Sequence, residues 1–282
     1  VVFEELGRAG VVEPFLDTAV LAGGLVADLG NDDQKAHVEE IIGGTMQMAF
    51  AHGEPTSRYD LTRVSTSATE KGDQIILSGR KAVVVNAEAA DMLVVSARES
   101  GGQGDADGIS LFLVPKDAEG LTVQGYALLA GGRAAEVILD DVSVPASARL
   151  GAAGKAADAI EARIAAANVA QTAETLGAME TAVKLTKDYL GTSKQFGRPI
   201  GEFQMVQKKL ADMYVWVETL RTFNYRTLAA AATVAAGEAG RGDIHKLTAA
   251  SVKYGGEIMN RVLDEAVQIH GGSGYIWESE IN

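Results

Sequence analysis

The hydrophobic pattern of this chain changes period twice, and that change constrains the fold more than any other feature. Residues 1–45 have helical spacing, residues 46–152 contain short β-rich runs, and residues 153–282 return to helical spacing. Apolar residues that recur every three or four positions indicate a helix, whereas alternation every two positions indicates a strand. We therefore predict a multidomain α+β protein with a partial N-terminal helical domain (1–45), a central β domain (46–152) and a C-terminal helical bundle domain (153–282).

The N-terminal part carries local signals for helix ends. The segment "NDDQKAHVEEIIGG" (31–44) begins with Asn31, continues with an apolar stripe and stops at two glycines. An Asn at a helix start accepts a hydrogen bond from a free backbone N–H group, and glycine readily ends a helix. Four glycines are interpreted as punctuation between helices: Gly7, Gly10, Gly30 and Gly43.

The central part contains five β-rich runs separated by Gly, Asp and Pro signals. They are "DQIILSGRKAVVVNA", "ADMLVVSAR", "GISLFLVPK", "GLTVQGYAL" and "AAEVILDDVSV". Strands at this spacing without helices between them predict an antiparallel barrel or sandwich. The glycine-rich stretch "GGQGDADG" (101–108) is predicted to be a hairpin loop. A nicotinamide enzyme is disfavoured, because no G-x-G-x-x-G follows a strand and opens a helix.

The C-terminal part predicts three long amphipathic helices with short connections, which is typical of a helical bundle. Within the second helix, "MYVWVETLRTFNYRTL" (213–228) places aromatic residues on more than one face: Tyr214, Trp216, Phe223 and Tyr225. Coverage this wide is explained in part by a central bundle helix and also favours an oligomer.

Composition excludes several classes of protein. The net charge of -13 argues against nucleic-acid binding, which needs clustered Lys and Arg. The absence of cysteine excludes disulfides, thiolate zinc sites and cysteine nucleophiles. No apolar run reaches transmembrane length and no signal-peptide pattern opens the chain, so we expect a cytoplasmic protein without a membrane span. Because the chain opens in mid-helix, it is expected to be a fragment with both ends missing.

Three segments together give the chain a resemblance to a known family. They are "AFAHGEP" (49–55), "KQFGRPIGEFQMVQKKLADM" (194–213) and "AVQIHGGSGY" (266–275). With the order helix, β, helical bundle, the chain resembles the acyl-CoA dehydrogenases, including bacterial members. The resemblance covers essentially the whole chain and implies a C-terminal four-helix bundle, truncated here. By the family's pattern, the first helices and the tail after the third segment are missing.

The resemblance implies α,β-dehydrogenation of an acyl-CoA thioester. A carboxylate removes the α-proton and the β-hydrogen leaves as hydride to FAD, with electron-transferring flavoprotein as the expected acceptor. The family binds FAD between the β domain and the bundle of a tetramer. It implies ten cofactor-binding residues: Phe50, Ala51, Gly53, Val83, Val85, Phe196, Gln204, Gln268, Gly271 and Gly272.

Two motifs depart from the family pattern. An Arg that pairs with the FAD pyrophosphate is replaced by Ser193, and Lys194 offers only a point charge in compensation. The strand that often reads Trp-Ile-Thr-Asn is "VVVN" (83–86), which we interpret as an ordinary buried strand. His52 is interpreted as a packed polar residue, with a position at the flavin edge as the alternative.

The catalytic base is not assigned by the sequence. One family position lies beyond the chain, and the other falls at Ala167 and Asn168, neither of which is acidic. Glu161 and Glu174 lie six or seven residues from Ala167, about 10 Å along a helix, and are interpreted as solvated charges. Glu278, just after the glycines, is interpreted as structural.

These losses favour one subunit of a heterotetramer like those that act on steroid or fatty acyl-CoA esters, although a homotetramer stays open. A flavin monooxygenase of the same fold and a non-catalytic partner subunit are the alternatives. Gly271 is predicted to end its helix in the left-handed conformation. Capping does not explain Gly272 and Gly274, and the resemblance places Gln268 and the paired glycines against the FAD of a neighbouring subunit.

Overall fold

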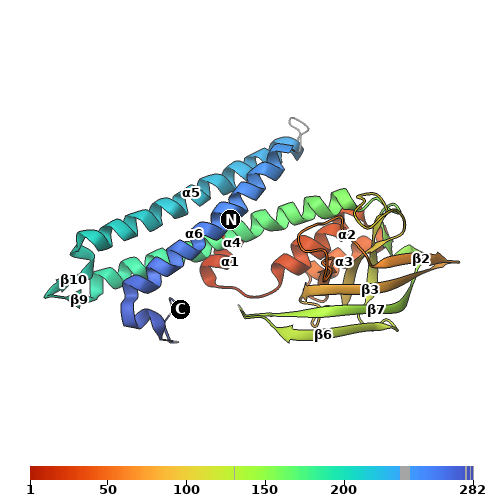
Figure 1. Cartoon of the computed structure of the whole chain (residues 1–282), viewed down its shortest axis with the longest axis horizontal. Coiled ribbons are helices and arrows are strands. Elements are labelled where there is room, and N and C mark those ends of the chain that lie inside the picture. Colours follow the sequence, from red (N-terminus) through yellow and green to blue (C-terminus); the bar gives the residue numbers. More distant parts are fainter. Residues whose placement is uncertain (130, 236–241, 277, 280, 282) are drawn as a thin grey trace. The chain divides into compact units, whose positions relative to one another are not determined.

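The computed structural model describes residues 1–129, 131–235, 242–276, 278, 279 and 281 (Figure 1). The chain divides into two compact units, one formed by Val1–Val11 with Asn168–Asn282 and the other by Val12–Ala167. The boundary falls within one long helix. The three-domain boundaries given above stay a prediction.

The N-terminal region is helical, as predicted, with four segments: α1 (Val2–Ala9), the π-helical η1 (Leu16–Ala22), α2 (Gly23–Leu29) and α3 (Asp32–Ile42). The predicted start of α3 is confirmed. The Asn31 side chain accepts from the Gln34 N–H at 2.9 Å, and the Gln34 side chain accepts from the Asn31 N–H at 3.0 Å. The interpretation of Gly7 as punctuation is wrong, because α1 continues through it and ends at Gly10, which has a φ of 64°.

The β domain contains the five predicted strands and three short ones. The bounds are β1 (Met48–Ala51), β2 (Ser67–Lys71), β3 (Gln74–Val85), β4 (Met92–Arg98), β5 (Ile109–Pro115), β6 (Leu121–Ala127), β7 (Arg133–Pro145) and β8 (Arg149–Leu150), with a 3₁₀ turn, η2 (Ala146–Ala148), before the last. They form one sheet in the order β6-β7-β3-β2-β4-β5-β8, and β1 also pairs with β4. The predicted hairpin loop connects β4 and β5, which are antiparallel.

The sheet is mixed rather than wholly antiparallel. β1 pairs with β4 in parallel, with Met48 opposite Met92 and Ala51 opposite Val95, and β2 touches β4 in parallel at Ser67 and Arg98. A parallel pair needs a long crossover connection. Here the hairpin of β2 and β3 lies in the sequence between β1 and β4. The predicted antiparallel arrangement is therefore wrong for the pairings of β1 and β2 with β4, whereas the other strand pairs of this sheet are antiparallel.

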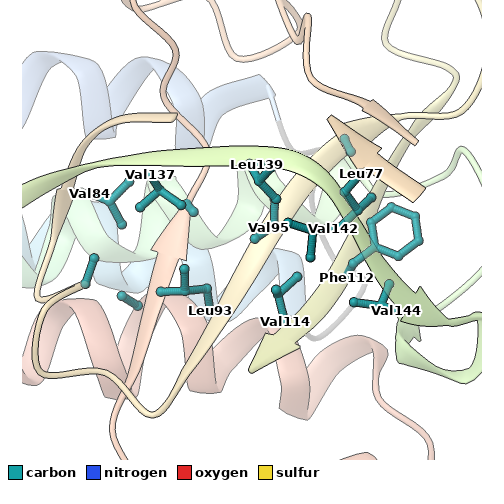
Figure 2. Close-up of a cluster of buried hydrophobic side chains, with 14 of the residues drawn as sticks. Leu77, Val84, Leu93, Val95, Phe112, Val114, Val137, Leu139, Val142 and Val144 are labelled. Carbon is teal, nitrogen blue, oxygen red and sulfur yellow. The ribbon is translucent and has the colours of Figure 1, made fainter. Parts of the chain in front are cut away.

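Two apolar layers explain the strand sequences. In β4, Leu93 and Val95 belong to one buried cluster and Val94 to another, so the strand is buried on both faces and reads as a continuous apolar run. The first cluster is formed mostly by strand residues, and Figure 2 shows Val137 and Leu139 pointing toward Leu93, Val95 and Val114. The second cluster packs the opposite face of β4 and β5 against α2 and the first turns of α4.

The predicted helices of the bundle are α4 (Ala157–Thr192), α5 (Gln204–Ala235) and α6 (Gly242–His270), followed by the 3₁₀ turn η4 (Gly271–Tyr275). Between α4 and α5 lie a small hairpin, β9 (Lys194–Gln195) with β10 (Arg198–Pro199), and the turn η3 (Ile200–Glu202). Helices α5 and α6 lie side by side (Figure 1). Their buried core contains Met213 and Leu220 of α5 and Val262 of α6, and α4 contributes Leu176 to it. Among the described residues, no helix is both long and apolar enough to span a membrane.

Candidate functional site

The ten predicted cofactor-binding residues fall into two groups, one in each compact unit. Phe50 and Ala51 end β1, and Gly53 follows two residues later, after His52. The Ala82 N–H donates to the Gly53 carbonyl oxygen at 2.8 Å, so the end of β1 lies against the part of β3 that contains Val83. The structure thus brings together residues that lie thirty positions apart in the sequence.

Val83 is not part of an ordinary buried strand, and that interpretation is wrong. The register between β3 and β7 shifts between Lys81 and Val84, and Val83 takes a φ of 54° with 58% of its surface exposed. A β-branched residue rarely adopts a positive φ, and such strain persists only where the surroundings impose it. Because the bulge turns Val83 outward, Val84 is buried in its place while Val85 is partly exposed.

A buried polar cluster lies beneath this group, and sequence reasoning missed its centre. Lys81 is fully buried, and its Nζ donates to Glu54 Oε1 at 2.8 Å, Ser96 Oγ at 3.0 Å and the His52 carbonyl oxygen at 3.3 Å. Nδ1 of His52 lies 2.9 Å from Ser96 Oγ. A charged residue within the apolar run of β3 was the sequence signal. The interpretation of His52 as a packed polar residue agrees with its burial.

The protonation states in this cluster follow from burial and mutual charge. Burial, helped by the charge of Lys81, lowers the pKa of His52 to about 4, so the ring is neutral at pH 7. Burial also acts to raise the pKa of Glu54, but the charge of Lys81 and hydrogen bonds from Lys81 and Thr66 outweigh it and lower that pKa to about 2. Burial lowers the pKa of Lys81 to about 8, which leaves the ammonium charged at pH 7.

The second group starts at the hairpin after α4. Phe196 and Gly197 form its two-residue turn with φ values of 54° and 79°, the mirror-image geometry that favours Asn-Gly. Phe196 is 93% exposed, although its ring edge meets Phe203 with the two centroids 6.2 Å apart. An exposed aromatic ring on a strained backbone gains little from its own fold. Gln204 follows as the exposed first residue of α5.

Ser193, which replaces the family's Arg, connects α4 to this hairpin. Its N–H donates to the Tyr189 carbonyl oxygen at 2.9 Å, and its carbonyl oxygen accepts from the Ile200 N–H at 2.9 Å. Both bonds use the backbone, so the side chain at this position is free to vary. Lys194 is exposed on β9. The hairpin is therefore anchored in the same way whichever side chain stands at position 193.

The glycine-rich end of α6 resolves into three different roles. Gly271 has a φ of 58°, as predicted for the residue that ends the helix. Gly274 is buried, and a Cβ there would overlap the Val267 carbonyl oxygen, so packing within this chain requires that glycine. A Cβ on Gly272 would meet no atom within 4 Å. Gln268, one turn earlier, is exposed.

His270 and Tyr189 join the two loops of this group. Their rings stack with centroids 4.3 Å apart, and the Tyr189 hydroxyl donates to the His270 carbonyl oxygen at 3.2 Å. Tyr189 also accepts the Ser193 N–H that anchors the hairpin. One aromatic pair therefore holds the hairpin and the glycine turn at the same end of the bundle.

The carboxylates weighed as a base differ in their surroundings. Glu161 and Glu278 are exposed. Glu174 is half-buried, and burial raises its pKa, so its interpretation as a solvated charge is wrong. It lies on α4, seven residues after Ala167. No group of His, Asp and Glu suited to hold a metal occurs in the described part of the chain.

Comparison with known proteins gives family matches that include residues of both compact units. Residues 49–142 match the acyl-CoA dehydrogenase middle domain, and residues 154–282 match the acyl-CoA dehydrogenase C-terminal domain. A subunit of the caffeyl-CoA reductase–Etf complex of Acetobacterium woodii is 30% identical over 99% of this chain and 73% of its own length. The chain belongs to the acyl-CoA dehydrogenase family. The predicted family and enzyme class, an acyl-CoA dehydrogenase, are thereby confirmed.

Solved structures of acyl-CoA dehydrogenases share the fold. Butyryl-CoA dehydrogenase from Megasphaera elsdenii superposes with a TM-score of 0.89 at 28% identity, covering 99% of this chain and 73% of the other. At 24% identity, a structure described as an FAD-dependent dehydrogenase has a TM-score of 0.90 and covers 100% of this chain and 76% of its own. The predicted α+β architecture is confirmed.

Proposed function

We propose that this acyl-CoA dehydrogenase carries out FAD-dependent α,β-dehydrogenation of an acyl-CoA thioester. The observation that carries the proposal is Phe196, an aromatic ring 93% exposed on a backbone with a φ of 54°. Strain of this kind is retained at functional sites, and a flat apolar surface is what a flavin ring system needs. The open space over Gly272 fits the same group, since a backbone without Cβ admits close approach of a ligand.

The residues of this chain bind and orient rather than react. Phe196, Gln204, Gln268, Gly271 and Gly272 are the proposed contacts in the bundle unit. When bound, FAD accepts the hydride equivalent from the β-carbon of the thioester. The hairpin and the glycine turn are fixed by Tyr189 and His270, so these contacts are preorganised and lose little freedom on binding.

In the β unit, the proposed cofactor contacts are Phe50, Ala51, Gly53, Val83 and Val85. Phe50 stacks on His52 with the ring centroids 5.3 Å apart and the rings 6° from parallel.

The catalytic base stays unassigned. Apolar surfaces exclude water from a reacting centre, and a carboxyl base in such surroundings has a raised pKa. Glu174 shows that direction of pKa shift, but we do not assign it as the base because of its distance along α4 from Ala167.

The acceptor and the assembly are part of the proposal. Electron-transferring flavoprotein is the proposed acceptor, in keeping with the relative that is named as a subunit of an Etf complex. A tetramer, of like or unlike subunits, is proposed because Tyr214 and Tyr225 on α5 are 60% and 47% exposed. We keep the cytoplasmic location as a prediction.

A second candidate is the same reaction in reverse, because that relative is named as a reductase. It would add hydride and a proton to an α,β-unsaturated acyl-CoA. The direction depends on the potential of the partner that exchanges electrons with the flavin, not on a different set of residues.

Anaerobic titration tests these proposals. The purified protein, alone and with candidate partner subunits, is titrated with saturated acyl-CoAs while the visible flavin absorption is followed. Anaerobic bleaching by an acyl-CoA, followed by little peroxide formation when air is admitted, supports the dehydrogenase over a monooxygenase, and reoxidation by an unsaturated acyl-CoA supports the reductase. Failure to hold FAD with or without a partner would contradict the proposal and favour a non-catalytic subunit.

A further inference from the structure

Lys81 is a buried charge with no assigned role. Its side chain is 0% exposed and that of its partner Glu54 is 3% exposed. An apolar pair of similar size is often as stable as a buried ion pair, so stability alone does not explain why this one is present. The groups that Lys81 holds in place suggest the reason.

The first of these groups is the loop that follows β1. Glu54 stands at the start of the loop, and its carboxylate accepts hydrogen bonds from residues at the far end: the Ser65 N–H at 2.8 Å, the Thr66 N–H at 2.9 Å and the Thr66 hydroxyl at 2.7 Å. Since Lys81 bonds the same carboxylate, the ammonium closes both ends of the loop onto β3.

The second group is the ring of His52. The Lys81 ammonium can only donate, so Ser96 Oγ accepts from it and is left to donate to Nδ1 of His52. The other ring nitrogen then carries the proton, and the ring forms a hydrogen bond with the Leu61 backbone. With both nitrogens engaged, the ring has one orientation, and Phe50 stacks on it nearly parallel.

The third group is the strained bulge of β3. Lys81 lies at its start, and the Lys81 ammonium donates to the His52 carbonyl oxygen while the Ala82 N–H donates to the Gly53 carbonyl oxygen. Two adjacent residues of β3 are thus bonded to two adjacent residues after β1. These bonds hold the backbone directly before Val83, where the positive φ occurs.

We propose that Lys81 is a positioning residue, which acts with Glu54 and Ser96 to fix the flavin-facing surface formed by Phe50, Gly53 and Val83. This inference rests on the proposed function. It concerns residues that do not contact the ligand, and it predicts that their loss weakens FAD binding in a protein that still folds.

The test is the double variant Lys81→Met/Glu54→Gln in the whole protein with any partner subunit. Removing both charges avoids leaving either one buried and unpaired. We expect a folded protein whose dissociation constant for FAD is about tenfold or more higher, because the binding surface is less preorganised. The visible absorption band of the bound flavin should also show less resolved vibrational structure. Lys71→Met, the same change at an exposed lysine of β2, should leave both unchanged.

Limited trypsin digestion gives a readout that does not depend on flavin. Arg58 and Arg63 are exposed cleavage sites in the loop. The double variant should be cut there faster, because Glu54→Gln keeps only one of the two acceptor oxygens that hold the far end of the loop and the anchor to Lys81 is lost. If the double variant fails to fold, Ser96→Ala keeps the ion pair and removes the hydroxyl that connects the Lys81 ammonium to His52. That variant should lose some thermal stability, because two buried polar groups lose a partner, and it should bind FAD more weakly at a temperature where it is still fully folded.

The outcomes separate the two proposals. A wild-type protein that never holds FAD contradicts the proposed function and this inference together. The role of Lys81 alone is overturned if the wild-type protein holds FAD and a folded variant, either the double variant or Ser96→Ala, has the same dissociation constant for FAD and the same flavin spectrum.

Discussion

Gly7 and Gly177 lie where α1 crosses α4, and each makes room for the backbone of the other helix. A Cβ on Gly7 would overlap the Glu174 carbonyl oxygen, and a Cβ on Gly177 would overlap the Glu4 carbonyl oxygen. The crossing is therefore closed from both sides, within one compact unit. Neither glycine is needed for its φ, since both lie inside helices.

Alanine at either position should destabilise the protein. Because backbone cannot move aside like a flexible side chain, we expect Gly7→Ala and Gly177→Ala each to lower the free energy of unfolding by about 2–3 kcal/mol. Gly256→Ala is the matched control, because Gly256 lies in α6 with no atom near its Cβ position, and it should raise stability by about 0.5–1 kcal/mol. Urea denaturation measures all three, and equal effects would contradict the packing role.

Phe196→Asn should weaken FAD binding and stabilise the folded protein. Asn tolerates the left-handed conformation of this turn, so the free energy of unfolding should rise by about 1 kcal/mol. Loss of the ring should weaken FAD binding about tenfold, in line with the value of an aromatic contact. Met205→Gln, which changes another exposed apolar residue nearby, should alter neither quantity appreciably. A variant with unchanged FAD affinity would exclude Phe196 from the site.

Ser193→Arg should strengthen FAD binding. An Arg at this position restores a side chain that can pair with two phosphate oxygens, and we expect about a tenfold lower dissociation constant. The hairpin should be undisturbed, because Ser193 uses only its backbone to hold it. Thr192→Arg adds the same charge one residue earlier and serves as the control. Equal gains in both variants would indicate a general charge effect instead.

Acid should destabilise the protein through His52. Its folded-state pKa of about 4 lies below the ordinary value of 6.5, so the unfolded chain binds the proton more readily. Stability is then fully present above pH 6.5 and falls by about 2–3 kcal/mol as the pH drops toward 4. His52→Gln should flatten this part of the profile, whereas His37→Gln should not. Denaturation curves between pH 7 and pH 4.5 provide the measurement.

Glu174→Gln should separate a structural carboxylate from a base. Its raised pKa means that stability is greatest below the ordinary value of 4.5 and declines as the pH rises through the folded-state value. The Gln variant should therefore be at least as stable at pH 7. We expect its dehydrogenation rate to be nearly unchanged, since losing a general base would cost about 10²–10⁴-fold. A loss of that size would identify Glu174 as the base.

The sequence by itself determined the local structure and the family. The cap at Asn31, the five strands, the three long helices and the left-handed Gly271 all depend on neighbours within one or two turns, which a pattern of residues records directly. The same local reading misjudged Gly7, because a helix crossing involves a partner more than 160 residues away.

Only the tertiary structure decided the surroundings of the candidate site. The strain at Val83 comes from a bulge whose bonds reach Gly53, and the burial of Lys81 requires β1, β3 and β4 to assemble around it. A charged residue in a strand is usually exposed, and the amino-acid sequence does not show which partners neutralise a buried one. The free energy of a buried charge depends on all of its neighbours at once, so its role becomes visible only after the chain has folded.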